Sequence, residues 1–254
     1  MISLKILLNG KNINRMNIDI STTSTIRPSI LDRTLNSFCS KIFNREDIDF
    51  RLIINIDFIG ETAKYSREDV LDVAKKYFKN IKYNYSDTPS FTKSVKWCWS
   101  NVDAGYVFHL EDDWVLNENI DIKKLINVIN DYENLAMIRL YKGKMAHNMK
   151  PFDSSYIKNE HKNMIRLLPK RACLNPGLFV KKYIQEASQI MVDNLNPESQ
   201  LCYGCSGIKH IDDFINKWEY SVYGYDRRVV TDIGREWRRR NRINRKPDFM
   251  KWEI

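Results

Sequence analysis

Residues 105–114, with the sequence GYVFHLEDDW, decide the fold and the place of the candidate site. The first six residues are mostly apolar, which predicts a strand that is buried on both faces. Three consecutive carboxylates, Glu111, Asp112 and Asp113, follow where this strand should end. In a sheet of parallel strands, ligands bind outside the carboxyl ends of the strands. These acids are therefore the first candidates for chemistry.

The three acids form an electrostatically costly cluster, because like charges on neighbouring residues repel each other. A divalent cation offsets this repulsion, and Mg²⁺ and Mn²⁺ prefer hard carboxylate oxygens. An acidic turn without a ligand is the alternative interpretation. We favour ligand binding, because the cluster lies between a buried strand and Trp114.

Strand and helix patterns alternate along the first half of the chain. Strand patterns cover residues 17–23, 50–56, 81–85, 105–110 and 136–141. Helical spacing of apolar residues covers 28–43, 66–80, 90–101 and 121–133. The strands are nearly all apolar, which is typical of a parallel sheet covered on both faces. The sequence therefore predicts an α/β fold with a mostly parallel, Rossmann-like sheet flanked by helices.

The second half of the chain, from residue 143, is less regular. A polar stretch at 143–163 precedes a strand-like segment at 164–168 and a loop at Asn175-Pro176-Gly177. The later elements are expected as helices near 180–194 and 208–218 and strands near 219–223 and 228–232.

Positive charge is the main compositional feature. Lys and Arg number 41 against 32 Asp and Glu, which gives a formal net charge of +9. A basic chain is expected to contact phosphates, nucleic acid or another acidic surface. The excess gathers between residues 235 and 246, where seven cations accompany one acid: Arg235, Arg238, Arg239, Arg240, Arg242, Arg245 and Lys246, with Glu236.

The lack of long apolar runs and of several well-known sequence motifs excludes some classes of protein. No apolar run approaches the ~18 residues of a membrane span, and we expect a cytoplasmic protein. The chain contains no P-loop, no G-x-G-x-x-G and no G-x-S-x-G motif. Nucleotide binding, if present, must therefore use another arrangement.

Glu111-x-Asp113 after a buried strand resembles the D-x-D motif of nucleotide-sugar glycosyltransferases of the GT-A fold, of the family 2 type. Three further stretches resemble that family in the required order, and the match spans roughly residues 17–240. They are Thr22-Thr-Ser-Thr-Ile-Arg27-Pro28, Ile54-Asn-Ile-Asp57 and Val230-Thr-Asp232-Ile-Gly234. The resemblance implies a GT-A fold, with 1–142 as the nucleotide-sugar-binding half and 143–254 as the acceptor-side half of one continuous domain.

The resemblance also implies roles at the donor end. Asp113 would bind the Mn²⁺ or Mg²⁺ that bridges the phosphates of the nucleotide sugar. Asp232 stands where a histidine ligand is usual and would be a second metal ligand or a turn residue. Glu111 would reach the ribose, or the metal through water. The other expected donor-binding residues are Thr22, Thr23, Arg27, Asp57, Asp112, Arg235 and Arg238.

An inverting transferase needs a general base for the acceptor hydroxyl. In the family this base is an acid at the start of a helix. Glu198, in Asn196-Pro197-Glu198, takes this place here, and Asp213 is the alternative. Acids at helix starts also act as plain caps, because they favour the positive end of the helix dipole.

The acceptor stays open between two classes. A small basic transferase without an anchor is compatible with a hydroxymethylated pyrimidine in viral DNA, approached through residues 235–246, which would place the protein in the host cytoplasm. A cell-surface or capsule glycan is the other candidate. A non-catalytic nucleic-acid-binding module on the same scaffold is a third possibility, and the sequence leaves the oligomeric state open.

Overall fold

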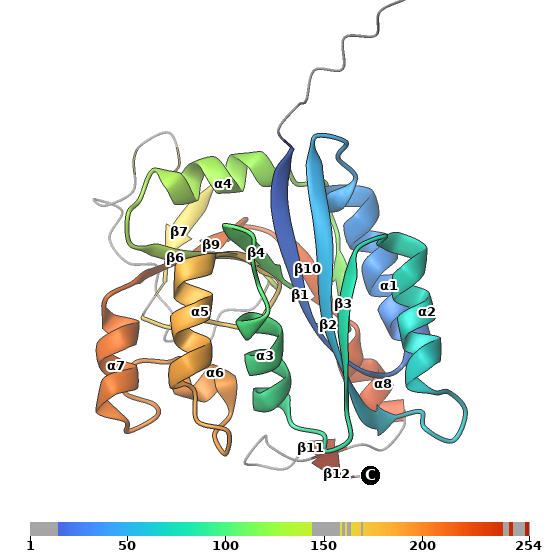
Figure 1. The fold of residues 1–254 in the computed structure, drawn as a ribbon. Helices are drawn as coiled ribbons and strands as arrows, with labels where there is room; N and C mark the ends of the chain where they lie inside the picture. Colours follow the sequence, from blue (N-terminus) through green and yellow to red (C-terminus); the bar gives the residue numbers. More distant parts are fainter. Residues whose placement is uncertain are drawn as a thin grey trace, which may run out of the picture.

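The computed structural model describes residues 15–143, 158, 161, 164–168 and 170–240, with the backbone of 244–245 and 252–253. A central eight-stranded sheet with helices on both faces forms the body of this part of the chain (Figure 1). None of the described helices is long and apolar enough to cross a membrane.

The sheet is mostly parallel, as the sequence predicted. Strands β3, β2, β1 and β4 are paired in parallel, and β6 and β9 are parallel to each other. Only β8 and β7 run antiparallel to their neighbours in the described sheet. In spatial order the strands are β3 (Ile81–Ser86), β2 (Ile48–Gly60), β1 (Met16–Ile26), β4 (Tyr106–His109), β8 (Gly177–Val180), β6 (Leu135–Leu140), β9 (Glu219–Tyr223) and β7 (Ile165–Leu167).

The helices cover the two faces of the sheet in two groups. The bounds are α1 (Pro28–Phe38) with the following π-turn η1 (Cys39–Phe43), α2 (Arg67–Tyr77), α3 (Phe91–Ser100), α4 (Ile122–Asn130), α5 (Lys181–Ile190), α6 (Pro197–Gln200), α7 (Lys209–Asn216) and α8 (Gly234–Arg240). One core cluster packs α1, α2 and α4 on one face, and the other packs α3, α5 and α7 on the opposite face. Ile54 belongs to the first cluster and Ile53 to the second, because successive strand residues point to opposite faces.

Local sequence signals explain several helix starts. Ser66 accepts a hydrogen bond from the backbone of Asp69, whose side chain accepts one from Ser66, so the predicted capping box of α2 is confirmed. Pro28 occupies the first turn of α1, where its missing N–H costs nothing. The predicted helix 28–43 is confirmed over its length, α-helical over Pro28–Phe38 and π-helical over Cys39–Phe43.

Four described strands were not predicted from the sequence: β5 (Trp114–Leu116), β8, and the short pair β11 (Asn244–Arg245) and β12 (Trp252–Glu253). Gly177 was expected in a loop but begins β8, which lies between β4 and β6. A Cβ at Gly177 would lie 2.8 Å from the Cα of Arg139, so glycine permits this close approach. Strand β5 pairs antiparallel with β10 (Val230–Asp232). This pairing joins the acidic cluster to the C-terminal part of the chain.

The first part of the basic segment is helical. Residues 234–240 form the helix α8 directly after β10. The side chains of the expected cations Arg242, Arg245 and Lys246 lie outside the described residues. Strands from both halves, 1–142 and 143–254, contribute to the central sheet, because β8, β9 and β7 belong to the second half.

Candidate active site

A cavity of about 280 Å³ lies beyond the carboxyl ends of β1, β2 and β4. Ten of the twelve expected site residues line it: Thr23, Arg27, Asp57, Glu111, Asp112, Asp113, Glu198, Asp232, Arg235 and Arg238. Thr22 and Asp213 are not among its lining residues. Residues from several elements between β1 and α8 therefore meet in one cavity. This cavity lies at the edge of the sheet where the sequence predicted ligand binding.

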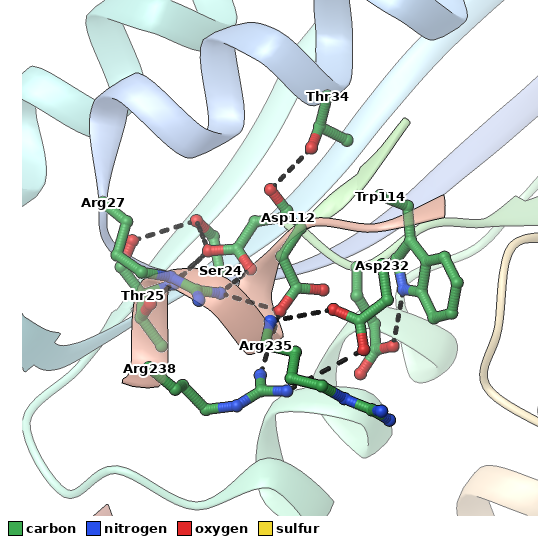
Figure 2. Close-up of polar contacts among 11 residues, drawn as sticks. Ser24, Thr25, Arg27, Thr34, Asp112, Trp114, Asp232, Arg235 and Arg238 are labelled. Carbon is green, nitrogen blue, oxygen red and sulfur yellow. Dashed lines mark hydrogen bonds and ion pairs between the residues drawn. The ribbon is translucent and has the colours of Figure 1, made fainter. Parts of the chain in front are cut away.

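Asp112 holds the loop that follows β1. Its carboxylate accepts hydrogen bonds from the Ser24 hydroxyl at 3.1 Å and the Thr25 amide at 3.0 Å, and it pairs with Arg27 (Figure 2). The Thr34 hydroxyl donates to its backbone carbonyl at 2.7 Å. Burial raises the pKa of Asp112, and the Arg27 guanidinium beside it opposes that rise. Asp112 is therefore engaged inside the protein, as an anchor for the loop that follows β1.

Arg27 is a buried cation at the floor of the site. It is 4% exposed and also approaches the carboxylate of Asp113, with Nη2 3.4 Å from Oδ2. The ring of Trp237 on α8 covers its guanidinium, with 4.8 Å from Cζ to the ring centroid. The attraction of Asp112 and Asp113 raises the pKa of Arg27, although burial opposes this. Arg27 thus links the β1 loop, the acidic cluster and α8.

Asp113 and Asp232 both face Arg238. The Arg238 guanidinium lies 3.3 Å from Oδ2 of Asp113 and 3.9 Å from Oδ2 of Asp232. Register pairing of Asp232 with Trp114 in the β10–β5 ribbon brings these two acids together. Asp232 also caps the start of α8, because its Oδ1 accepts the Arg235 amide at 3.0 Å.

The carboxylates of Asp113 and Asp232 are oxygen ligands of the kind that divalent cations prefer. Mg²⁺ and related hard cations are commonly held by one or two carboxylates together with substrate phosphates. Within the described residues, no group of three or more His, Cys, Asp or Glu side chains is placed to hold a metal. Both carboxylates lie beside Arg238, so a cation would compete with Arg238 for them.

Glu111 and Asp57 border the same cavity. Glu111 accepts the indole N–H of Trp114 at 3.0 Å, which fixes the carboxylate beside the acidic cluster. Asp57, at 5% exposure, accepts hydrogen bonds from Ser94 and Asn55, each at 2.9 Å. Burial raises the pKa of Asp57 to about 6, against the lowering effect of these donors. Asp57 therefore changes its charge in the mildly acidic range.

The two candidate bases lie in different surroundings. Glu198 on α6 lines the cavity, and its Oε1 accepts the Leu174 amide at 3.2 Å. Asp213 on α7 is exposed and lies outside the cavity lining. Thr22 is buried in β1, with its hydroxyl unpartnered and away from the cavity. The geometry thus brings Glu198, and neither Asp213 nor Thr22, to the acids of the site.

The sequence analysis missed several lining residues. Ser24 and Thr25 lie inside the Thr22–Pro28 motif, so the motif itself was a signal for them. Arg171, Asn175 and Asn196 carried no spacing signal, because they reach the cavity from segments that are distant in sequence. The missed lining residues are Ser24, Thr25, Phe91, Trp114, Lys142, Arg171, Asn175, Asn196 and Ser199.

Comparison with known proteins identifies the fold. No protein-family model matches the chain, and no curated protein sequence matches it. Among solved structures, the fold is similar to that of TarS from S. aureus, with a TM-score of 0.52 and 12% sequence identity. The match covers 85% of this chain and 36% of TarS.

Two further TarS structures match equally well over 85% of this chain. They are TarS 1–349 in complex with UDP, at a TM-score of 0.51 and 12% identity with 60% of that chain covered, and with UDP-GlcNAc, at 0.51 and 12% with 58% covered. The chain spans less than two thirds of each of these proteins. The likeness establishes a GT-A-like fold for this chain.

Proposed function

We propose that this protein is a glycosyltransferase that moves a sugar from a nucleotide sugar to an acceptor hydroxyl. The observation that carries the proposal is the gathering of Asp57, Asp113, Asp232 and Arg238 around one cavity in a GT-A fold. These residues supply a base- or ribose-binding acid, two carboxylates and a phosphate-binding cation. These are the roles that the sequence resemblance implied, and their shared place in the cavity lining supports assigning them here.

The donor half of the site is assigned as follows. Asp57 and Thr23 bind the nucleoside, and Arg235 and Arg238 bind the diphosphate through charge-assisted hydrogen bonds. Asp113 and Asp232 would hold a divalent cation, Mn²⁺ or Mg²⁺. When bound, this cation neutralises the negative charge that develops on the departing nucleoside diphosphate. Arg27 remains paired with Asp112 and keeps the donor loop in place.

Glu198 is proposed as the general base. It removes the proton of the acceptor hydroxyl, whose oxygen then bonds to the anomeric carbon as the bond from that carbon to the diphosphate breaks. Attack from the face opposite the leaving group inverts the configuration at that carbon. The Leu174 amide orients one carboxylate oxygen of Glu198.

The DNA acceptor remains a prediction. Of the four described arginines on α8, Arg238 points to Asp113, and Arg240 is paired with Glu236 on the helix surface. The surplus of positive charge available to a polyanion is therefore smaller in the described residues than the sequence count suggested. A cell-surface or capsule glycan stays the alternative acceptor.

Thermal unfolding with a panel of nucleoside diphosphates tests the proposed function. A ligand present at 100 times its dissociation constant stabilises the folded state by about 2.7 kcal/mol. We expect at least one nucleoside diphosphate to raise the melting temperature, and more so with Mn²⁺ than with chelator. UDP is the first choice, since TarS is known in complex with UDP. Duplex DNA alone raising the melting temperature would instead favour a binding module.

A further inference from the structure

Two cysteine thiols meet in the turn that follows α6. The Sγ atoms of Cys202 and Cys205 lie 2.7 Å apart, and both cysteines are free. The C-x-x-C spacing allows this approach, because the Cys205 amide donates to the Cys202 carbonyl at 3.0 Å and closes the turn. A bond between the two sulfurs, with a length of about 2.0 Å, therefore requires only a small movement of the side chains.

The fold holds the backbone of this turn in place. Gly204 has a φ of +72°, a conformation that glycine adopts without strain. Its amide donates to Oδ1 of Asp212 on α7 at 2.8 Å. The backbone of Cys202 forms a β-bridge with that of Arg171. The turn is therefore tied to α7 and to a distant segment of the chain, and both ties hold the two cysteines in their relative positions.

The two thiols differ in exposure. Cys205 is exposed, whereas Cys202 is half-buried. Burial raises the pKa of the Cys202 thiol to about 12, and its hydrogen bond with Cys205 adds to this rise. Cys202 is therefore protonated at neutral pH. Because the thiolate is the nucleophile, we expect an external reagent to react first with Cys205.

A zinc site is not favoured by these thiols. Structural zinc sites in proteins are almost always held by four ligands. Across the described residues, the side chains of His, Cys, Asp and Glu form no group of three or more that could hold a metal. The described surroundings of Cys202 and Cys205 therefore favour chemistry of the thiols themselves.

We propose that Cys202 and Cys205 are a reversible redox site, which forms an internal disulfide by exchange with a low-molecular-weight disulfide. The Cys205 thiolate attacks one sulfur of that reagent, whose S–S bond breaks, and one thiolate leaves. Cys202 then attacks the Cys205 sulfur of the mixed disulfide, and the second thiolate leaves. Each leaving thiolate takes up the proton that the attacking cysteine has lost. The two protein thiols are thereby oxidised, and the reagent is reduced to two thiols.

Trapping of free thiols tests this site. The reduced protein is incubated with oxidised glutathione, the remaining thiols are alkylated, and peptide mass mapping locates each disulfide. We expect each chain to lose two free thiols, in a disulfide that maps to Cys202 and Cys205. Dithiothreitol should restore both thiols.

Single serine variants separate the two steps. Cys202→Ser should stop at the mixed disulfide and keep one glutathione on Cys205. Cys205→Ser should form no internal disulfide and should react at least roughly tenfold more slowly, because the raised pKa of Cys202 leaves little thiolate. Cys205 is exposed, so Cys205→Ser decides the matter if Cys202→Ser fails to fold.

Cys39→Ser is the matched control. Cys39 is half-buried on η1, and burial raises the pKa of its thiol to about 12, as it does for Cys202. The described contacts pair Cys202 with Cys205 and place no second thiol beside Cys39. The Cys39→Ser variant should therefore form the internal disulfide like the unaltered protein.

Four results would overturn the proposal. A glutathione adduct that persists on Cys205 in the unaltered protein would show that Cys202 does not reach it. A disulfide between two chains on a non-reducing gel would assign the exposed thiol to another reaction. Formation of the internal disulfide in Cys205→Ser would place the bond elsewhere. Finally, no loss of thiols in the folded protein, under conditions that oxidise the chain unfolded in urea, would show that the fold withholds this pair from exchange.

Discussion

The Nη1 atom of Arg238 lies 3.3 Å from Oδ2 of Asp113, although the two residues are 125 positions apart in the sequence. This contact joins α8 to the acidic cluster at the end of β4. It depends on the β5–β10 ribbon, in which the Ile233 amide also donates to the Asp113 carbonyl at 2.9 Å. The first residues of α8 are therefore part of the site wall.

Gly234 permits this approach, and its replacement provides a test. A Cβ at Gly234 would lie 1.8 Å from Oδ2 of Asp113, so Gly234→Ala must displace the carboxylate or α8. We expect this variant to bind the nucleoside diphosphate at least roughly tenfold more weakly, because the carboxylate is misplaced. Gly105→Ala is the matched control, since nothing lies within 4 Å of its added Cβ. Equal binding in both variants would contradict this account.

Removing the carboxylate of Glu198 and removing that of Asp213 are expected to have different effects on turnover. Glu198→Gln should lower kcat by roughly 10²- to 10⁴-fold with little change in donor affinity, because a general base acts on the acceptor. Asp213→Asn should leave kcat near normal, since Asp213 is exposed outside the cavity. Steady-state kinetics of both variants gives the answer. A loss of turnover confined to Asp213→Asn would make Asp213 the base.

The raised pKa of Asp57 predicts that the stability of the protein depends on pH. Its folded-state pKa of about 6 lies above the ordinary value of 3.8, so the folded state binds the extra proton more tightly. Its contribution to the free energy of unfolding is therefore largest below pH 3.8 and is lost as the pH rises through about 6.

Asp57→Asn should remove this contribution. At pH 7.5 we expect the variant to gain up to about 3 kcal/mol relative to the unaltered protein, and at pH 4 to gain little. Denaturant unfolding of both proteins at the two pH values measures the difference. A gain of the same size at both pH values would show that Asp57 does not titrate in this range.

The basic segment predicts the salt dependence of DNA binding. Each phosphate that a protein neutralises contributes about −0.9 to the slope of log affinity against log salt. Arg238 and Arg240 are engaged within the protein, so at most five of the seven cations remain for DNA. We expect a slope no steeper than about −4.5. Fluorescence anisotropy with duplex DNA at several salt concentrations measures it, and a slope near −6 would contradict this expectation.

The first half of the fold was predictable from sequence because its strands are long or strongly apolar. Strands at 17–23, 50–56 and 105–110 and the capping box at Ser66 are local signals, and the structure confirms them. The short strands β5 and β8 were not predictable. They have three and four residues, and their pairing is set by distant parts of the chain.

The candidate site also has features that could be predicted from the sequence and features that could not. Asp57, Asp113 and Asp232 could be found because each follows or ends a strand within a recognisable motif. The motif could not show that Asp112 is bound by Arg27, or that Arg238 lies between Asp113 and Asp232.

Release of nucleoside diphosphate from nucleotide sugars tests the proposed function most directly. The protein is incubated with a panel of nucleotide sugars and Mn²⁺ without acceptor, so that water takes the place of the acceptor hydroxyl. We predict slow release of nucleoside diphosphate and free sugar from at least one donor, reduced at least roughly 100-fold in Asp113→Asn and little changed in Asp72→Asn on the surface of α2. No release from any donor, together with no binding of any nucleoside diphosphate, would contradict the assignment as a glycosyltransferase.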